Sequence, residues 1–265
     1  MPLAIVAGLV VLGLLALAVF GPWLTPADPF KASMLGRLKA IGSDGFPLGS
    51  DELGRDMLSR LMVGARLSLF MGITPVVLAF VIGSAIGILA GYAGGMVNTA
   101  IMRTIDVFYA FPSVLLAIAL SGALGAGIGN ALLSLTIVFI PPIARVAESV
   151  TTQVRGRDYV EAARASGADA FTIVRVHVLG NVLGPIFVYA TSLIAVSMIL
   201  ASGLSFLGLG VKPPEPEWGL MLNTLRTAIY VQPWVAALPG VMIFITSISF
   251  NLLTDGLRSA MDIKA

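Results

Sequence analysis

One short polar stretch, Arg157 to Gly167 (RDYVEAARASG), interrupts a long apolar region of the chain. Asp158 is followed three residues later by Glu161, which is the spacing of a capping box and predicts that a helix starts at Asp158. Gly167 suits the left-handed position that ends a helix. The helix between them would have about eight residues, and isolated helices shorter than about 12 to 15 residues are marginal in water. It therefore needs a surface to pack against.

That surface is either the chain's own bundle or a partner protein. The small side chains of Ala162, Ala163 and Ala165 permit a close approach, while Glu161 and Arg164 offer charged contacts at the margin. The residues alone leave both possibilities open.

Other chemistry is sparse. The chain has no cysteine and one histidine, His177, so a histidine-built metal site and most nucleophile–base pairs are disfavoured. No phosphate-binding G-x-x-x-x-G-K-[ST], no H-E-x-x-H and no G-x-S-x-G occurs. The basic residues do not cluster, which argues against binding to nucleic acid.

A membrane enzyme with paired carboxylates remains open, although the only acidic residues in or next to the predicted spans are Asp106 and Glu148, near their ends. Arg103, three residues before Asp106, predicts a local ion pair there.

The composition predicts an all-α integral membrane protein. Hydrophobic residues make up 57% of the 265 residues, charged residues 11%, and the mean hydropathy is +0.97, whereas soluble domains carry about 25% charged residues. Spanning takes about 20 apolar residues. Six runs qualify, at about residues 3–20, 67–90, 105–124, 128–147, 178–201 and 235–253. A cleaved signal peptide is the alternative for the first run, because Ala16-Leu17-Ala18 resembles a cleavage site.

Two regions are predicted, residues 1–66, with the first span and a polar loop, and a core of about five spans, 67–265. In the first, Ser50 would cap a short amphipathic surface helix beginning at Asp51, with Asp51/Arg55 and Asp56/Arg60 as i,i+4 pairs. Residues 203–233 are rich in proline and aromatic residues and cannot form one continuous helix. Gly83, Gly87 and Gly91 form a row that lets another helix approach closely, within the chain or in a dimer.

The positive-inside rule does not orient these spans. With the N-terminus inside, the 16 Lys and Arg residues divide equally between the two sides.

Several motifs resemble a known family. Glu161, Ala162, Ala163 and Gly167 match the EAA loop of ABC importer permeases. The remaining motifs resemble the dipeptide/oligopeptide/nickel branch, and in particular its C-type subunit. They are Leu48 to Asp56 (LGSDELGRD), Gly64 to Leu69 (GARLSL), Ala90 to Gly95 (AGYAGG), Met102-Arg103 with Asp106, Phe111-Pro112, Leu204 to Gly210 (LSFLGLG), Trp218-Gly219 and Phe250 to Arg258 (FNLLTDGLR). Together they cover about residues 47–262.

The resemblance implies a type I ABC importer permease-like fold in a bacterial inner membrane, with both termini cytoplasmic. It implies a cytoplasmic EAA coupling helix whose ATPase-coupling residues are Asp158, Tyr159, Glu161, Ala162, Ala163, Arg164 and Gly167. The implied partners are a sister permease in a heterodimer, two ATPase domains, separate or fused, an external substrate-binding protein and membrane lipid. ATP and Mg²⁺ would bind to the ATPases and no cofactor to this chain, which would not be an enzyme. Peptides, nickel and opines all fit as cargo, and a secondary transporter or channel is the rival class.

Overall fold

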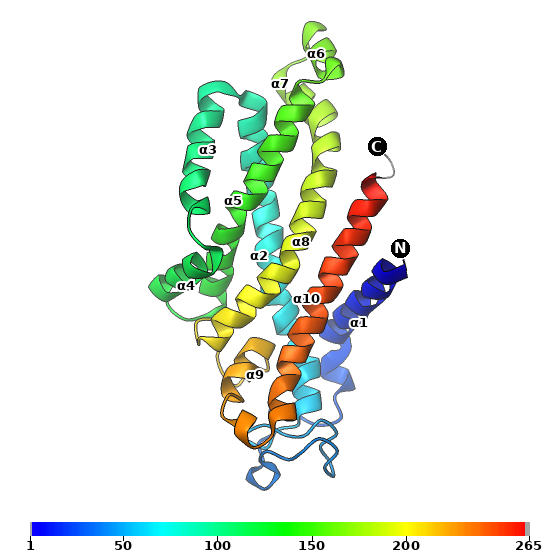
Figure 1. The fold of residues 1–265 in the computed structure, drawn as a ribbon, viewed down its shortest axis with the longest axis vertical. Coiled ribbons are helices and arrows are strands. Elements are labelled where there is room, and N and C mark those ends of the chain that lie inside the picture. Colours follow the sequence, from blue (N-terminus) through cyan, green and yellow to red (C-terminus); the bar gives the residue numbers. More distant parts are fainter. Residues whose placement is uncertain (1, 263–265) are drawn as a thin grey trace.

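The protein is an elongated bundle of helices, shown in Figure 1. The computed structural model describes residues 2–262. In chain order the elements are α1 (Pro2–Leu24), η1 (Met34–Gly36), α2 (Met57–Ala93), α3 (Gly95–Tyr109), α4 (Ser113–Leu124), α5 (Ile128–Arg155), α6 (Asp158–Ala165), α7 (Ala170–Thr172), the π-helical η2 (Ile173–Val178), α8 (Leu179–Phe206), α9 (Trp218–Thr224), η3 (Ala228–Tyr230) and α10 (Pro233–Asp262).

Five of these segments are long and apolar enough to cross a membrane, and α3 with α4 makes a sixth if the pair counts as one span. The expected all-α, roughly six-span architecture is therefore confirmed. The uninterrupted span predicted at 105–124 is wrong, because α3 and α4 meet at 86°. Proline disfavours helical backbone at the residue before it, and Pro112 lies at this break, immediately before α4.

The predicted surface helix beginning at Asp51 is also wrong. The Asp51 carboxylate accepts hydrogen bonds from the backbone amides of Leu53 and Arg55, both at 2.9 Å, and thereby closes a turn. Gly54 has a φ of +72°, which a helix does not permit. The helix starts only at Met57, where the Asp56 side chain caps it by accepting from the Ser59 amide at 2.8 Å.

From Met57, α2 runs unbroken for 37 residues, so the division expected between 66 and 67 falls inside one helix. The Asp51–Arg55 ion pair exists at 2.6 Å, but on the turn, and Arg60 reaches Asp51 at 3.4 Å. These buried charges hold the loop at residues 25–56 against the start of α2.

Residues 203–233 fold back onto the same end of α2, and as expected they do not form one helix. The Trp218 side chain is fully buried and its indole N–H donates to the Leu61 carbonyl at 3.0 Å. Glu217 caps α9 by accepting from the amides of Gly219 and Leu220, both at 2.8 Å. Burial raises the pKa of this carboxyl group. The connection is therefore a folded cap on the bundle.

The glycine row of α2 faces α5 of the same chain. A Cβ added at Gly83 would lie 3.0 Å from the Ile140 carbonyl oxygen, and one at Gly91 would lie 2.7 Å from that of Glu148. At Gly87 it would lie 2.6 Å from the Ala147 Cβ. The two backbones are thus so close that a side chain at any of these positions would force the α5 atoms facing it to shift.

We expect Gly87→Ala to lower the thermal unfolding midpoint of the detergent-solubilised protein, because overpacking typically costs about 1–3 kcal/mol. The control is Gly13→Ala in α1, where an added Cβ meets nothing within 4 Å. Equal midpoints for the two variants would show that the α2–α5 contact relaxes without cost.

Candidate functional site: the α6 end and the α3–α5 face

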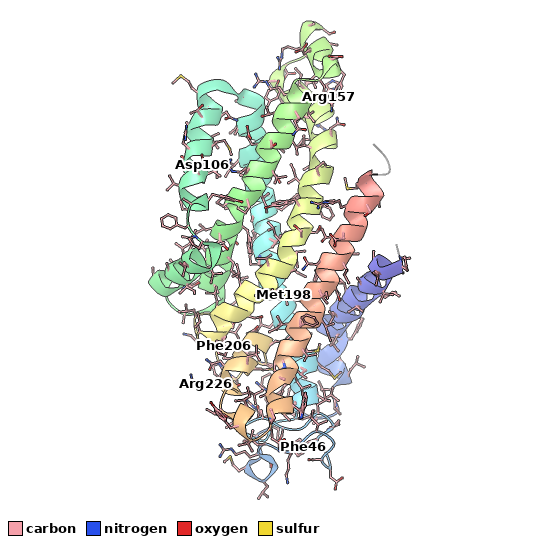
Figure 2. The ribbon with its side chains drawn as sticks, viewed as in Figure 1. Phe46, Asp106, Arg157, Met198, Phe206 and Arg226 are labelled. Atoms are coloured by element: carbon pink, nitrogen blue, oxygen red, sulfur yellow. The ribbon has the colours of Figure 1, made fainter. Side chains whose placement is uncertain are left out.

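Helix α6 lies at the extreme end of the molecule, beyond the ends of α5 and α8 (Figure 1). It has the expected eight residues. The predicted capping box is wrong, because the N-cap is Arg157, whose backbone is extended, and no side chain caps this end. Asp158 and Glu161 instead both lie in the first turn, where negative charge favours the helix dipole. Figure 2 marks Arg157 at this tip.

The other end of α6 closes as expected. Gly167 has a φ of +86°, in the left-handed region that glycine adopts without strain. The Ala168 amide donates to the Ala163 carbonyl at 3.1 Å across the turn. This turn sets the direction of the chain into α7 and η2.

Helix α6 presents two different faces. Val160 is fully buried in the main hydrophobic cluster together with Ile173, and Ala163 packs against that cluster. The rings of Tyr159 and His177 lie 6.4 Å apart. The bundle therefore supplies the surface that a short helix needs, and Ala163 faces inward. The residues left exposed are Asp158, Tyr159, Glu161, Ala162, Arg164 and Ala165.

The segment that follows is held by Asp169. Its carboxylate accepts from the Thr172 hydroxyl at 2.5 Å and from the amides of Phe171 and Thr172 at 3.1 and 3.4 Å. The Thr172 hydroxyl first, and then these amides, lower the pKa of the Asp169 carboxyl group. These bonds cap the start of α7, which follows the Gly167 turn.

A second polar feature lies on α3 and α5. Asp106 forms an ion pair with Arg145, and their side chains are 39% and 47% exposed. The Arg145 guanidinium also lies over the Tyr109 ring, 5.5 Å from its centroid. The ion pair expected with Arg103 is therefore wrong. Glu148 accepts from the Asn98 amide nitrogen at 2.7 Å.

Beside this pair is a cavity of about 300 Å³ between α3, α4, α5 and α8. Its wall includes the rings of Tyr109, Tyr189 and Phe139 and the adjacent prolines Pro141 and Pro142. Within residues 2–262 no three His, Asp or Glu side chains are grouped to hold a metal ion. The sequence did not reveal this site because the ion pair joins residues 39 positions apart.

Residues 83–264 match the family described as binding-protein-dependent transport system inner membrane component. The chain belongs to this family. It is accordingly a multi-pass permease subunit of a bacterial inner-membrane ABC importer, and the family implies ATPase and substrate-binding protein partners.

Relatives match over nearly the whole chain. The glutathione transport permease GsiD of Pectobacterium atrosepticum is 43% identical over 98% of this chain and 87% of its own length. The di/tripeptide transport permease DppC of Pseudomonas aeruginosa is 42% identical over 93% and 83%. The probable D,D-dipeptide transport permease DdpC of Escherichia coli is 37% identical over 100% and 88%.

Solved structures share the fold. A chain of the methionine ABC transporter MetNI, in an inward-facing conformation, aligns with a TM-score of 0.59 at 21% identity, over 76% of this chain and 97% of that one. A chain of an amino acid ABC transporter aligns with a TM-score of 0.56 at 13% identity, over 75% and 92%. The expected importer permease fold is confirmed.

Replacement of Gly167 by valine should displace α6, because a left-handed conformation costs a non-glycine residue about 1–2 kcal/mol. Gly156→Val is the matched control at the other side of α6, since Gly156 has a φ of −85°. We expect limited proteolysis to cleave the 156–169 region faster in Gly167→Val than in the control. Equal cleavage rates would show that the turn does not fix α6.

Proposed function

We propose that this chain forms half of the pathway of an ATP-driven importer of short peptides. It pairs with a sister permease as a heterodimer, and the exposed face of α6 docks on a cytoplasmic ATPase. The observation that carries the proposal is that face itself, with Glu161, Ala162 and Arg164 open at the tip of the molecule. Peptide cargo is supported by the peptide and glutathione systems in which the relatives serve.

The position of α6 allows it to transmit motion from a docked ATPase to the helix bundle. It follows α5 after only two residues, Gly156 and Arg157, and its Val160 is fully buried in the core. A displacement of the docked ATPase therefore moves α6, the end of α5 and the start of α8 as one body. ATP and Mg²⁺ bind to the ATPases, and this chain couples their closure to the pathway without catalysis of its own.

The proposed coupling requires one orientation of the chain in the membrane. The α6 end lies in the cytoplasm, and so do the start of α1 and the end of α10, which are the ends of those helices nearer to α6 in Figure 1. The cap formed by residues 25–56 and α9 lies outside, where the binding protein delivers cargo.

The test uses the complete importer in proteoliposomes. The wild-type complex should take up a labelled dipeptide only when ATP is supplied. Ala162→Asp should insert and pair with the sister permease, yet lose uptake by tenfold or more, with ATPases that bind weakly or hydrolyse ATP without uptake. The reason is that an unpaired charge buried at an interface costs about 3–5 kcal/mol.

The control is Ala93→Asp, an exposed alanine at the end of α2, which should retain uptake. Wild-type uptake in Ala162→Asp with the ATPases normally bound would remove the coupling role of α6. Uptake by the wild-type complex without ATP would favour a secondary transporter.

A further inference from the structure

The Asp106–Arg145 pair lies well away from the α6 end of its two helices. Arg145 is ten residues before the end of α5 at Arg155, and Asp106 is eleven residues after the start of α3 at Gly95. At 1.5 Å per residue, both positions are ~15 Å from the α6 end of their helices. Two independent helices thus place the pair at the same depth, and Figure 2 shows Asp106 well below Arg157.

This depth is within the apolar layer. Helix α5 has 28 residues and is ~42 Å long, against a hydrocarbon core of ~30 Å. Provided that α5 spans the whole core, the pair lies inside the core even if the entire excess of ~12 Å projects beyond the membrane at the α6 end.

The pair is also not enclosed by its own chain, since close to half of each side chain is exposed. Charged side chains at this depth face a bundle interior or a water-filled cavity, because contact with lipid is costly. The α3–α5 face therefore does not face lipid in the assembled importer.

The pair adjoins the cavity through a shared ring. Tyr109 lies under the Arg145 guanidinium and also lines the cavity. The cavity's volume of about 300 Å³ is at the lower end of the range for small-molecule pockets. Its further wall carries Tyr189 of α8 and Ser113 at the start of α4. The charged pair therefore lies next to a space for a small ligand whose wall is rich in aromatic rings, and Tyr109 contacts both.

We propose that Asp106, Arg145 and this cavity form a subsite on the pathway wall for the two charged termini of a short zwitterionic peptide. A guanidinium binds a carboxylate through two parallel hydrogen bonds. The Asp106 carboxylate receives the ammonium group, and the face of a tyrosine ring also attracts a cation. Because the ligand carries both charges, it replaces each partner of the ion pair and leaves no charge unpaired in the apolar layer. The proposal rests on the peptide-import function proposed above.

Two other roles are outcomes of the test. The pair could act only as a brace between α3 and α5, or it could be buried against the sister permease.

The first experiment measures access to water. In the complete importer in proteoliposomes, Ser113→Cys should react with a membrane-impermeant sulfonated thiol reagent, and a saturating dipeptide with ATP and binding protein should slow the reaction several-fold. Val81→Cys, on a 62% exposed apolar position of α2, should not react. Ser113→Cys that does not react, or that the dipeptide does not protect, would overturn the subsite.

The second experiment separates recognition of the peptide termini from a purely structural role of the pair between α3 and α5. The double variant Asp106→Asn with Arg145→Gln keeps hydrogen-bonding side chains in both places but binds neither terminus as an ion. We expect dipeptide uptake to fall tenfold or more while the sister permease and ATPases still co-purify. Arg226→Gln, exposed at the other end of the molecule (Figure 2), is the charge-loss control and should transport normally.

Retained uptake in the double variant would assign the pair to a brace, and failure to assemble would assign it to the sister interface; either outcome overturns the proposal. Failure of the underlying function is recognised separately. In that case the wild-type complex itself takes up no dipeptide, whatever the reactivity of Ser113→Cys.

Discussion

The close contact of α2 with α5 positions the features on which function depends. Between apolar helices in lipid there is little hydrophobic driving force, so their association relies on close packing. Gly83, Gly87 and Gly91 bring the α2 backbone against carbonyl groups of α5. Helix α5 in turn bears Arg145 near its middle and α6 beyond its end. A shift of α5 on α2 would therefore displace the charged pair and α6 together.

Helix α6 has one face packed on the bundle and one face open to a partner. Its inner face, with Val160 and Ala163, belongs to the core of the chain, while Glu161, Ala162 and Arg164 remain open. A helix of eight residues is too short to be stable alone, so it follows the body on which it packs. The same short element is part of the permease and, in the function that we propose, a contact for an ATPase. It touches α5 directly and reaches α8 through η2.

Patterns within a few residues of each other predicted most of this structure. Apolar runs located the spans, and Gly167 located the end of α6. The predictions that failed involve either partners that are distant in the sequence or side chains that interrupt the expected helix locally. Asp51 engages its own backbone instead of starting a helix, and Pro112 marks the break between α3 and α4. Asp106 pairs with Arg145, 39 residues away, rather than with nearby Arg103. Ala163 is one of the residues that the resemblance assigns to ATPase coupling, and only the fold shows that it is also partly buried against the core.

The functional account depends on which side of the membrane α6 faces. Single cysteines in place of Lys39 and Arg157 test this directly, because the chain has no cysteine of its own and both side chains are exposed. Arg157 lies at the α6 end, and Lys39 belongs to the loop at residues 25–56, whose Phe46 is labelled at the opposite end in Figure 2. In intact cells stripped of their outer membrane, a membrane-impermeant maleimide should label Lys39→Cys, and it should label Arg157→Cys only after the cells are lysed. Labelling of Arg157→Cys in intact cells, with Lys39→Cys protected until lysis, would place α6 outside and contradict its coupling to ATPases.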